Sequence, residues 1–275
     1  MHSFSGRKYK AFFVFHKMKI HLRNLSIFII LITGLSACAP TPAPQKELLI
    51  YCGITMYRPM REIADIIEVQ ENIKVIIIKG GSGNLLRSIE INGVGDLYLP
   101  GSASYIESAK EKDLIDRVEL VGYNRAALMV QEGNPLNISA NLENLINPDY
   151  YLVIGNPESG SIGKETRQVL EQEGLYEDVL QNAHELTTDS KDLVSALVEQ
   201  RADIVVNWYA VSTWGDNATY MDVLPLPTNF FPVKELFLAK LSTAKEPELA
   251  DIFMNYAITE EGQAIFEKYG FGTPQ

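Results

Sequence analysis

The stretch IIIKGGSGNLLRSIE, residues 76–90, joins a strand pattern directly to a helix pattern. β-Branched residues fill its first part, and Leu85, Leu86 and Ile89 then follow a helical spacing. The turn at residues 80–83 reads Gly-Gly-Ser-Gly. Such a turn has two explanations. Glycine permits a tight turn, and a serine with free N–H groups at a helix start can bind an anion.

The same alternation of strand and helix patterns continues along the chain. We expect strands at 47–54, 73–79, 95–101, 126–133, 150–157 and 202–210. We expect helices at 57–70, 84–91, 104–115, 141–147, 163–174 and 189–201. Alternating strands and helices form mainly parallel sheets with helices on both faces, so the sequence predicts an α/β fold.

The N-terminus has the pattern of a secretory signal. Residues 1–37 contain six basic residues and no acidic residue, and an apolar run at 25–35 is too short for a normal membrane span. The ending Leu-Ser-Ala-Cys resembles a bacterial lipobox, in which Cys38 is lipidated and becomes the first mature residue. The alternative is a secreted protein with a plain cleavage site. Met18 is an alternative start, since a complete signal follows it.

The proline-rich segment 38–46 is typical of a tether between a lipid anchor and a folded body. We therefore predict a location in the periplasm or on the outer cell surface. The chain has 24 Lys and Arg against 35 Asp and Glu, for a net charge of −11, and the basic leader makes the body more acidic still. An acidic body argues against a nucleic-acid partner.

Hydroxyl or glycine residues mark four of the strand-to-helix turns, at 54–56, 81–83, 159–163 and 188–190. In open α/β sheets, ligands bind at the carboxyl ends of the strands, where helix N-termini offer unpaired N–H groups. Helix capping alone explains any one of these turns. Four together indicate a small oxyanion site. The chain has neither a Walker loop nor a Gly-x-Gly-x-x-Gly motif.

Several longer motifs resemble a known family. They are LLIYCGITM, SGNLLRSIE, GDLYLPGS, VIGNPESGSIGKETRQVLEQEGLYE, LVSALVEQRADIVV and PELADIFMNYAITEEGQAIFEKYGF. Over residues 47–271 the chain resembles the type II periplasmic substrate-binding proteins of ABC importers, and most of all the molybdate- and tungstate-binding family. The resemblance implies a small anionic ligand, an ABC permease and ATPase as partners, and a monomer.

The resemblance also implies two α/β domains around a ligand cleft. Domain I would comprise 47–124 with 232–275, and domain II would comprise 125–231. The chain would cross between them near 122–125 and 226–233. The two domains would close on the ligand like a clamshell.

The ligand-binding residues of the family transfer to particular positions. A first-loop hydroxyl falls on Thr55, and a second-loop serine falls on Ser82. Backbone amides fall near Ile162 and Lys191. A tyrosine of the family is replaced by Asn207, whose amide can donate but has a shorter reach.

Other positions belong to the same loops. A second group of candidate ligand contacts consists of Gly81, Gly83, Ser161 and Tyr209. Aromatic residues near the turns indicate either a wider cleft or ordinary packing: Tyr51, Tyr57, Trp208 and Tyr209. Another oxyanion, a small organic acid or a phosphonate therefore fits nearly as well as molybdate. Arg87 is interpreted as a surface or interdomain ion pair, and Asp96 as a structural cap or a hinge contact.

We expect no enzyme, no metal site and no cofactor. Cys52 and His184 are the only candidates for a catalytic nucleophile and its base. Cys52 lies in an apolar strand, however, and is more typical of a buried core residue. With Cys38 lipidated, Cys52 would have no cysteine partner in the body. A ligand sensor that feeds a membrane signalling partner is an alternative to import, and the sequence does not separate the two.

Overall fold

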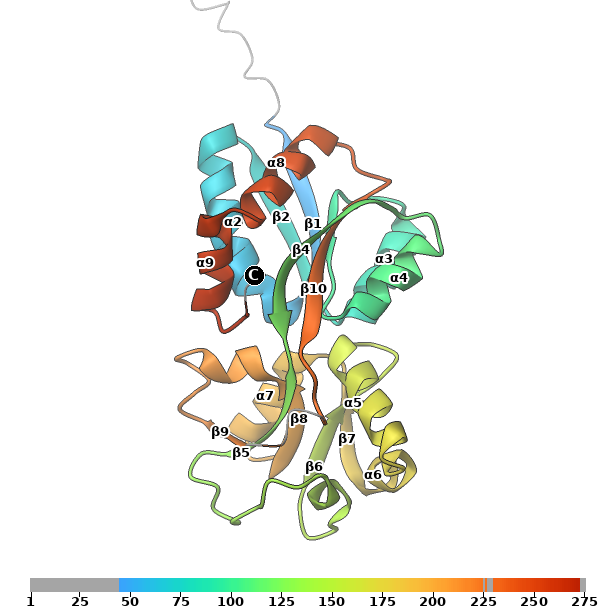
Figure 1. Cartoon of the computed structure of the whole chain (residues 1–275), viewed down its shortest axis with the longest axis vertical. Helices are drawn as coiled ribbons and strands as arrows, with labels where there is room; N and C mark the ends of the chain where they lie inside the picture. Colours follow the sequence, from blue (N-terminus) through green and yellow to red (C-terminus); the bar gives the residue numbers. More distant parts are fainter. Residues whose placement is uncertain (1–44, 225, 227–229, 273–275) are drawn as a thin grey trace, which may run out of the picture. The chain divides into compact units, whose positions relative to one another are not determined.

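The computed structural model describes residues 45–224, 226 and 230–272 (Figure 1). The predicted signal 1–37, the lipidation site Cys38 and most of the tether lie outside these residues. Among the helices of the described part, none is long and apolar enough to cross a membrane.

The first sheet has the strand order β2-β1-β3-β10-β4. Its strands are β1 (Glu47–Gly53), β2 (Lys74–Gly80), β3 (Leu97–Leu99), β4 (Ile115–Asn124) and β10 (Lys234–Leu241). Its helical segments are η1 (Ile54–Met56), α2 (Tyr57–Glu71), α3 (Ser82–Asn92), α4 (Ala103–Lys110), α8 (Pro247–Ala257) and α9 (Glu260–Lys268). We call this sheet and its helices lobe 1.

The second sheet has the strand order β7-β6-β8-β5-β9. Its strands are β5 (Ala126–Gln131), β6 (Leu152–Gly155), β7 (Ala183–Thr187), β8 (Ile204–Trp208) and β9 (Met221–Leu224). Its helical segments are η2 (Leu142–Ile146), α5 (Ser161–Gln172), α6 (Tyr176–Asn182), α7 (Ser190–Val198) and η3 (Tyr209–Thr213). We call this sheet and its helices lobe 2.

The two-lobed α/β fold confirms the predicted fold class, and each sheet is mixed in direction. In lobe 1, β1 is parallel to β2 and β3, whereas β10 is antiparallel to β3 and β4. In lobe 2, β6 is parallel to β7 and β8, and β5 is antiparallel to β8 and β9. The parallel pairs belong to the predicted strand–helix–strand series.

The chain passes between the lobes along paired strands. β4 ends at Asn124 and β5 begins at Ala126, while β10 runs antiparallel beside β4 (Figure 1). The strands of the first sheet lie within the predicted limits of domain I, and those of the second sheet lie within the predicted limits of domain II. The exact limits of the two domains stay a prediction. The predicted helix over 104–115 ends at Lys110, because Ile115 already pairs with Leu241 of β10.

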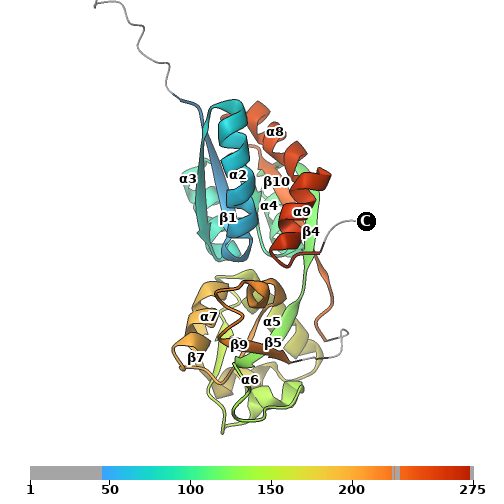
Figure 2. The same ribbon diagram turned by 90° about the vertical axis from the view of Figure 1, so that its left-hand side faces the viewer.

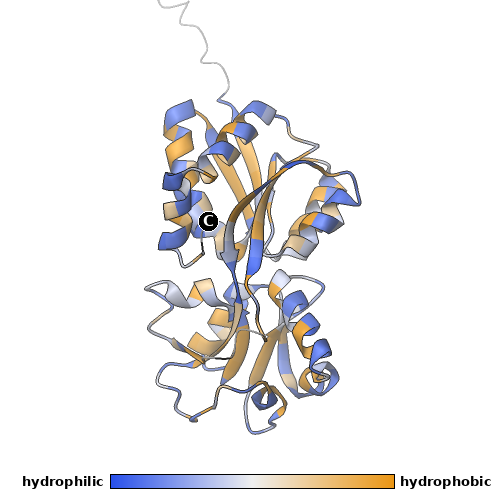
Figure 3. Cartoon of the chain, in the orientation of Figure 1, coloured by the Kyte–Doolittle hydropathy of each residue, from blue (hydrophilic) through white to orange (hydrophobic). Residues whose placement is uncertain are grey.

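Helices cover both faces of the first sheet (Figure 2). α2, α8 and α9 pack together over one core cluster, and α3 and α4 pack over a second cluster on the other face. Lobe 2 has a single large cluster built on β5, β6 and β8. Apolar residues follow the strands, while the outer helix faces are polar (Figure 3). These cores fix the strand ends from which the loops of the site begin.

Candidate ligand-binding site

Loops at the carboxyl ends of four strands meet in one small cavity between the lobes. η1 follows β1 and α3 follows β2 in lobe 1, while α5 follows β6 and α7 follows β7 in lobe 2. We call it the loop cavity; its polar lining includes Thr55, Ser82, Ser161 and Ser190, beside Gly81 and Ile162. Its volume of about 10 Å³ holds roughly one water molecule. The structure thus shows the loops closed against one another.

Two hydroxyls of the loop cavity, those of Ser82 and Ser161, accept hydrogen bonds from their own lobes. Ser82 Oγ accepts a hydrogen bond from the N–H of Gly101 at 3.0 Å, and Ser161 Oγ accepts one from Trp208 Nε1 at 3.3 Å. Neither hydroxyl donates to a partner among the described residues. A hydroxyl that already accepts keeps its own hydrogen available. Both serines are therefore arranged to donate to an acceptor in the cavity.

The N-termini of α3 and α5 add backbone donors. Ser82 and Ile162 lie in the first turns of these helices, and within the described residues their N–H groups have no hydrogen-bond partner. The first N–H groups of a helix carry a partial positive charge because no carbonyl of the helix accepts from them. The predicted roles of Ser82 and Ile162 are compatible with this geometry.

The start of α7 is different, because a carboxylate of the protein itself already accepts hydrogen bonds from its N–H groups. Asp189 Oδ1 accepts hydrogen bonds from the N–H groups of Lys191 at 2.8 Å and Asp192 at 3.3 Å. Burial, followed by the charge of Asp192, raises the pKa of Asp189. The backbone amide of Lys191, which the sequence predicts as a ligand contact, is therefore engaged within the protein. Ser190 supplies the hydroxyl that α7 contributes instead.

Asn207 and Tyr209 do not line the loop cavity. Asn207 is fully buried in β8; its Nδ2 donates to the carbonyl of Ser190 at 3.0 Å, and its Oδ1 accepts from the N–H of Trp208 at 2.8 Å. Asn207 thus positions the start of α7. The ring of Tyr209 packs against the guanidinium of Arg125, 4.3 Å from its centroid.

Gly81 and Gly83 allow the lobes to touch. The N–H of Gly83 donates to the carbonyl of Ser159 in lobe 2 at 3.0 Å. A Cβ on Gly81 would lie 2.4 Å from the oxygen of Ser159 and 2.6 Å from that of Thr188. Since heavy atoms do not approach so closely, the glycines of the turn at 80–83 serve lobe contact as well as the turn itself.

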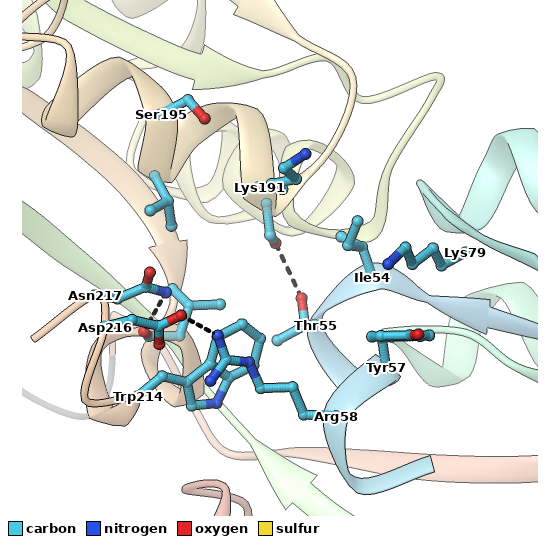
Figure 4. A pocket seen from close by; sticks show the side chains of 13 residues that line it. Ile54, Thr55, Tyr57, Arg58, Lys79, Lys191, Ser195, Trp214, Asp216 and Asn217 are labelled. Atoms are coloured by element: carbon cyan, nitrogen blue, oxygen red, sulfur yellow. Dashed lines mark hydrogen bonds and ion pairs between the residues drawn. The ribbon is translucent and has the colours of Figure 1, made fainter. Parts of the chain in front are cut away.

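A second, larger cavity lies beside the loop cavity and has a volume of about 400 Å³ (Figure 4). The two cavities share Ile54, Thr55 and Ser190. We call the larger one the side cavity; three basic side chains line it, those of Arg58, Lys79 and Lys191. Sequence reasoning identified Lys191 but missed Arg58 and Lys79, because no motif marks them.

Aromatic rings hold two of these cations. The guanidinium of Arg58 lies over Trp214, 4.4 Å from the ring centroid, and forms an ion pair with Asp216 (Figure 4). The ammonium of Lys79 lies 3.7 Å from the ring centroid of Tyr57. Of the four aromatic residues considered for a wider cleft, only Tyr57 lines this cavity. Tyr51 and Trp208 are buried core residues.

Cys52 and His184 do not form a catalytic pair. Cys52 is buried in β1 and donates a weak hydrogen bond to the carbonyl of Gly53, whereas His184 lies in β7 of lobe 2 against Tyr151. Burial raises the pKa of the Cys52 thiol far above its usual range. Within the described residues, no group of three His, Cys, Asp or Glu side chains is placed to hold a metal ion.

Asp96 has the structural role that the sequence favoured, whereas within the described residues Arg87 forms a hydrogen bond and not the predicted ion pair. Asp96 accepts hydrogen bonds from the N–H groups of Leu49 and Lys245, both at 2.7 Å, and so ties β1 to the segment before α8. Arg87 is exposed on α3, and its guanidinium donates to Asn84 Oδ1 of the same helix at 3.2 Å. Neither residue lines the loop cavity.

Comparison with known proteins gives one matching family model. The model, described as bacterial extracellular solute-binding protein, matches residues 48–272. A Haemophilus influenzae protein named as a binding protein is 21% identical over 225 residues, which are 82% of this chain and 90% of that protein.

Solved structures share the fold. The periplasmic molybdate-binding protein of Azotobacter vinelandii is 16% identical with a TM-score of 0.70, and the match covers 83% of this chain and 100% of that one. The sulfate-binding protein SubI of Mycobacterium tuberculosis is 15% identical with a TM-score of 0.71, with 82% and 86% covered.

Proposed function

Since the chain belongs to the family of bacterial extracellular solute-binding proteins, we propose that it captures a small oxyanion of the molybdate or tungstate kind in the loop cavity. The predicted class is confirmed: the family and the structures of the same fold are solute-binding proteins and not enzymes. The identity of the solute belongs to the proposal. An ABC permease and ATPase would receive it.

One observation supports the oxyanion above all. Ser82 and Ser161 belong to different lobes, and each has its acceptor side occupied by a donor of its own lobe. Both hydroxyls are thereby left as donors that face one cavity. Hydrogen bonds from neutral donors to an ionised acceptor are stronger than those between neutral groups. An anion with several oxygens satisfies such a set of donors, whereas a cation does not.

Binding requires the lobes to separate first. The loop cavity has room for about one water molecule, and the carbonyl of Ser159 in lobe 2 accepts hydrogen bonds from the N–H groups of Gly83 and Asn84 in lobe 1. In our proposal the lobes open, the anion binds to Thr55 and Ser82 of lobe 1, and lobe 2 closes over it. In the closed structure Thr55 Oγ1 donates a hydrogen bond to Ser190 Oγ of the other lobe. An anion oxygen would replace this bond.

A screen of ligands against the folded protein tests this proposal. The protein from residue 45 onward would be melted with molybdate, tungstate, sulfate and phosphate in turn. A ligand that binds only the folded state stabilises it by about 2.7 kcal/mol at a hundredfold excess over Kd. We expect at least one anion to raise the melting temperature. A series with no response, followed by no heat of binding in calorimetry, would exclude an inorganic oxyanion as the ligand.

We also propose that lipid on Cys38 anchors the protein to a membrane. The motif Leu-Ser-Ala-Cys supports this, together with the tether that follows it. Expressed in a bacterial host, the full chain should partition into the detergent phase of a Triton X-114 extraction. The wild type should also incorporate a radiolabelled fatty acid, whereas the Cys38→Ala variant should not, whether or not its signal is removed. Equal labelling of both proteins would contradict the anchor.

A further inference from the structure

We propose that the side cavity is a second anionic subsite, so that the ligand is a small organic molecule with two negatively charged groups. One group, a phosphonate or phosphate, would occupy the loop cavity, and a carboxylate or second phosphate would occupy the side cavity. This inference rests on the proposed function and names its substrate class. It keeps the oxyanion in the loop cavity and makes it one charged group of an organic ligand.

The size and position of the side cavity support this inference. Its volume of about 400 Å³ falls in the range of small-molecule sites, whereas the loop cavity alone holds about one water molecule. Thr55 and Ser190 line both cavities. A ligand whose head displaces the hydrogen bond between these two residues would therefore extend directly into the side cavity.

The charge of the side cavity is opposite to that of the protein. Arg58, Lys79 and Lys191 line it together with one carboxylate, Asp216, in a chain whose net charge is −11. Asp216 is paired with Arg58. Among the residues that the structure describes, no carboxylate lies within ion-pair distance of Lys79 or Lys191. The subsite thus has two ammonium groups from different lobes that form no ion pair among the described residues, and the acidic neighbour of Lys191 is Asp189, whose carboxylate is bound to the start of α7.

The remaining walls suit a carbon skeleton. Val194, Val211 and Ile54 provide apolar surface, and Trp214 provides an aromatic face that Arg58 covers. Tyr57 holds the Lys79 ammonium near the cavity through its ring. A bare tetrahedral anion in the loop cavity would lie beside Ile54 but would not reach Val194, Val211 or Trp214, which line the side cavity alone. A short aliphatic chain between two charged groups would contact both the apolar wall and the lysines.

Matched ligands separate the two subsites. Methylphosphonate offers the head group alone, propylphosphonate adds an uncharged chain, and 3-phosphonopropionate carries a carboxylate in place of the terminal methyl group. Affinities would be measured by isothermal titration calorimetry at low salt. We expect 3-phosphonopropionate to bind about three- to tenfold more tightly than propylphosphonate, the range of a partly exposed charged contact.

Variants that remove one lysine charge each test which residues cause the preference for 3-phosphonopropionate over propylphosphonate. Lys79→Gln and Lys191→Gln should each reduce the ratio of the two affinities, and the double variant should bring it close to one. Lys74→Gln is the matched control, because Lys74 is also exposed on β2 but pairs with Glu47 outside the cavity. The control should keep the ratio.

The outcomes distinguish this inference from the proposed function. Equal binding of propylphosphonate and 3-phosphonopropionate, or a preference that survives the double variant, would overturn the subsite and leave the loop cavity intact. Tight binding of an inorganic anion, with no binding of any of the three phosphonates, would also overturn the subsite and leave the loop cavity as the binding site. If neither phosphonates nor inorganic anions bind, the proposed function fails together with the subsite.

Discussion

The hydroxyl of Thr55 donates a hydrogen bond to the hydroxyl of Ser190 at 3.1 Å, although the two residues lie 135 positions apart. Thr55 follows β1 of lobe 1, and Ser190 opens α7 of lobe 2. Both hydroxyls are buried. This contact therefore reports the closed arrangement of the lobes, and a ligand in the loop cavity has to replace it with bonds of its own.

Removal of the Ser82 hydroxyl should weaken anion binding. The Ser82→Ala variant loses a donor to the anion, which corresponds to about 1.5–3 kcal/mol for a hydrogen bond to a charged group. Calorimetry with the best anion of the screen would measure it. The variant also leaves the buried N–H of Gly101 without its acceptor, so the free energy of unfolding should fall by about 1–3 kcal/mol.

Ser108→Ala provides the control for that variant. Ser108 Oγ donates to the carbonyl of Ser104 within α4, away from the loop cavity. Its loss should leave anion affinity unchanged. An affinity of Ser82→Ala equal to that of Ser108→Ala would remove Ser82 from the site.

A methyl group on Gly81 should prevent the lobes from closing. Its Cβ would overlap the carbonyl oxygens of Ser159 and Thr188, whereas a Cβ on Gly80 would meet only the side chain of Leu85 at 3.8 Å. Gly81 has φ −68° and ψ 137°, values open to alanine, so the effect is steric and not conformational. We expect Gly81→Ala to weaken binding by more than about tenfold, or 1.4 kcal/mol.

Gly80→Ala, at the adjacent last residue of β2, is the comparison for Gly81→Ala. It should keep most of the affinity because its methyl group makes only ordinary contact. Small-angle scattering with saturating ligand would compare the two. A compact, ligand-closed Gly81→Ala protein would show that the predicted clash is relieved and that Gly81 is not required for closure.

Glu165 should make stability depend on pH. It is buried on α5, and Lys234 Nζ lies 3.0 Å from its Oε1, although Oε1 has no directed hydrogen bond from the described residues. Burial raises the pKa of Glu165 against the opposing effect of Lys234. The folded state thus holds the proton more tightly than the unfolded state.

The sign of the effect follows from that direction. The contribution of Glu165 to the free energy of unfolding is fully present below its unfolded pKa of about 4.3 and is lost as pH rises through the raised folded value. Urea unfolding at a series of pH values would compare the wild type with Glu165→Gln. The wild type should lose stability relative to this variant across that window. A constant difference between the two proteins would contradict the prediction.

Cys52 should be inert in the folded protein. Its side chain is fully buried, and burial raises the pKa of its thiol, so little thiolate is available to react. In the protein from residue 45 onward, a thiol reagent should label it only after denaturation. Cys52→Ala should retain anion binding. Rapid labelling in the native state, or loss of binding in the variant, would reopen a chemical role for this residue.

The sequence alone was sufficient for the strand–turn–helix units and for the turn that carries Ser82. Glycine, serine and the change from strand to helix periodicity are local signals, since they act within a few neighbouring residues. The same signals marked the turns that contain Thr55, Ser161 and Ile162, and the family resemblance pointed to Thr55 and Ile162 within them; all three line the loop cavity. Strands β4, β7, β9 and β10 were missed. β4 shows few fully buried positions, and its pairing with β10 is a contact between distant parts of the chain.

The site's remaining features depend on tertiary structure. The carboxylate of Asp189 accepts a hydrogen bond from the N–H of Lys191, and the side-chain amide of Asn207 donates one to the carbonyl of Ser190. No residue pattern predicts either of these bonds. The side cavity unites Arg58 and Lys79 of lobe 1 with Lys191 of lobe 2. The sequence by itself therefore determined the fold class and which loops face the cleft, because both follow from local periodicity. Only the packing of one lobe against the other decided which side chains meet there, because those contacts join residues far apart in the chain.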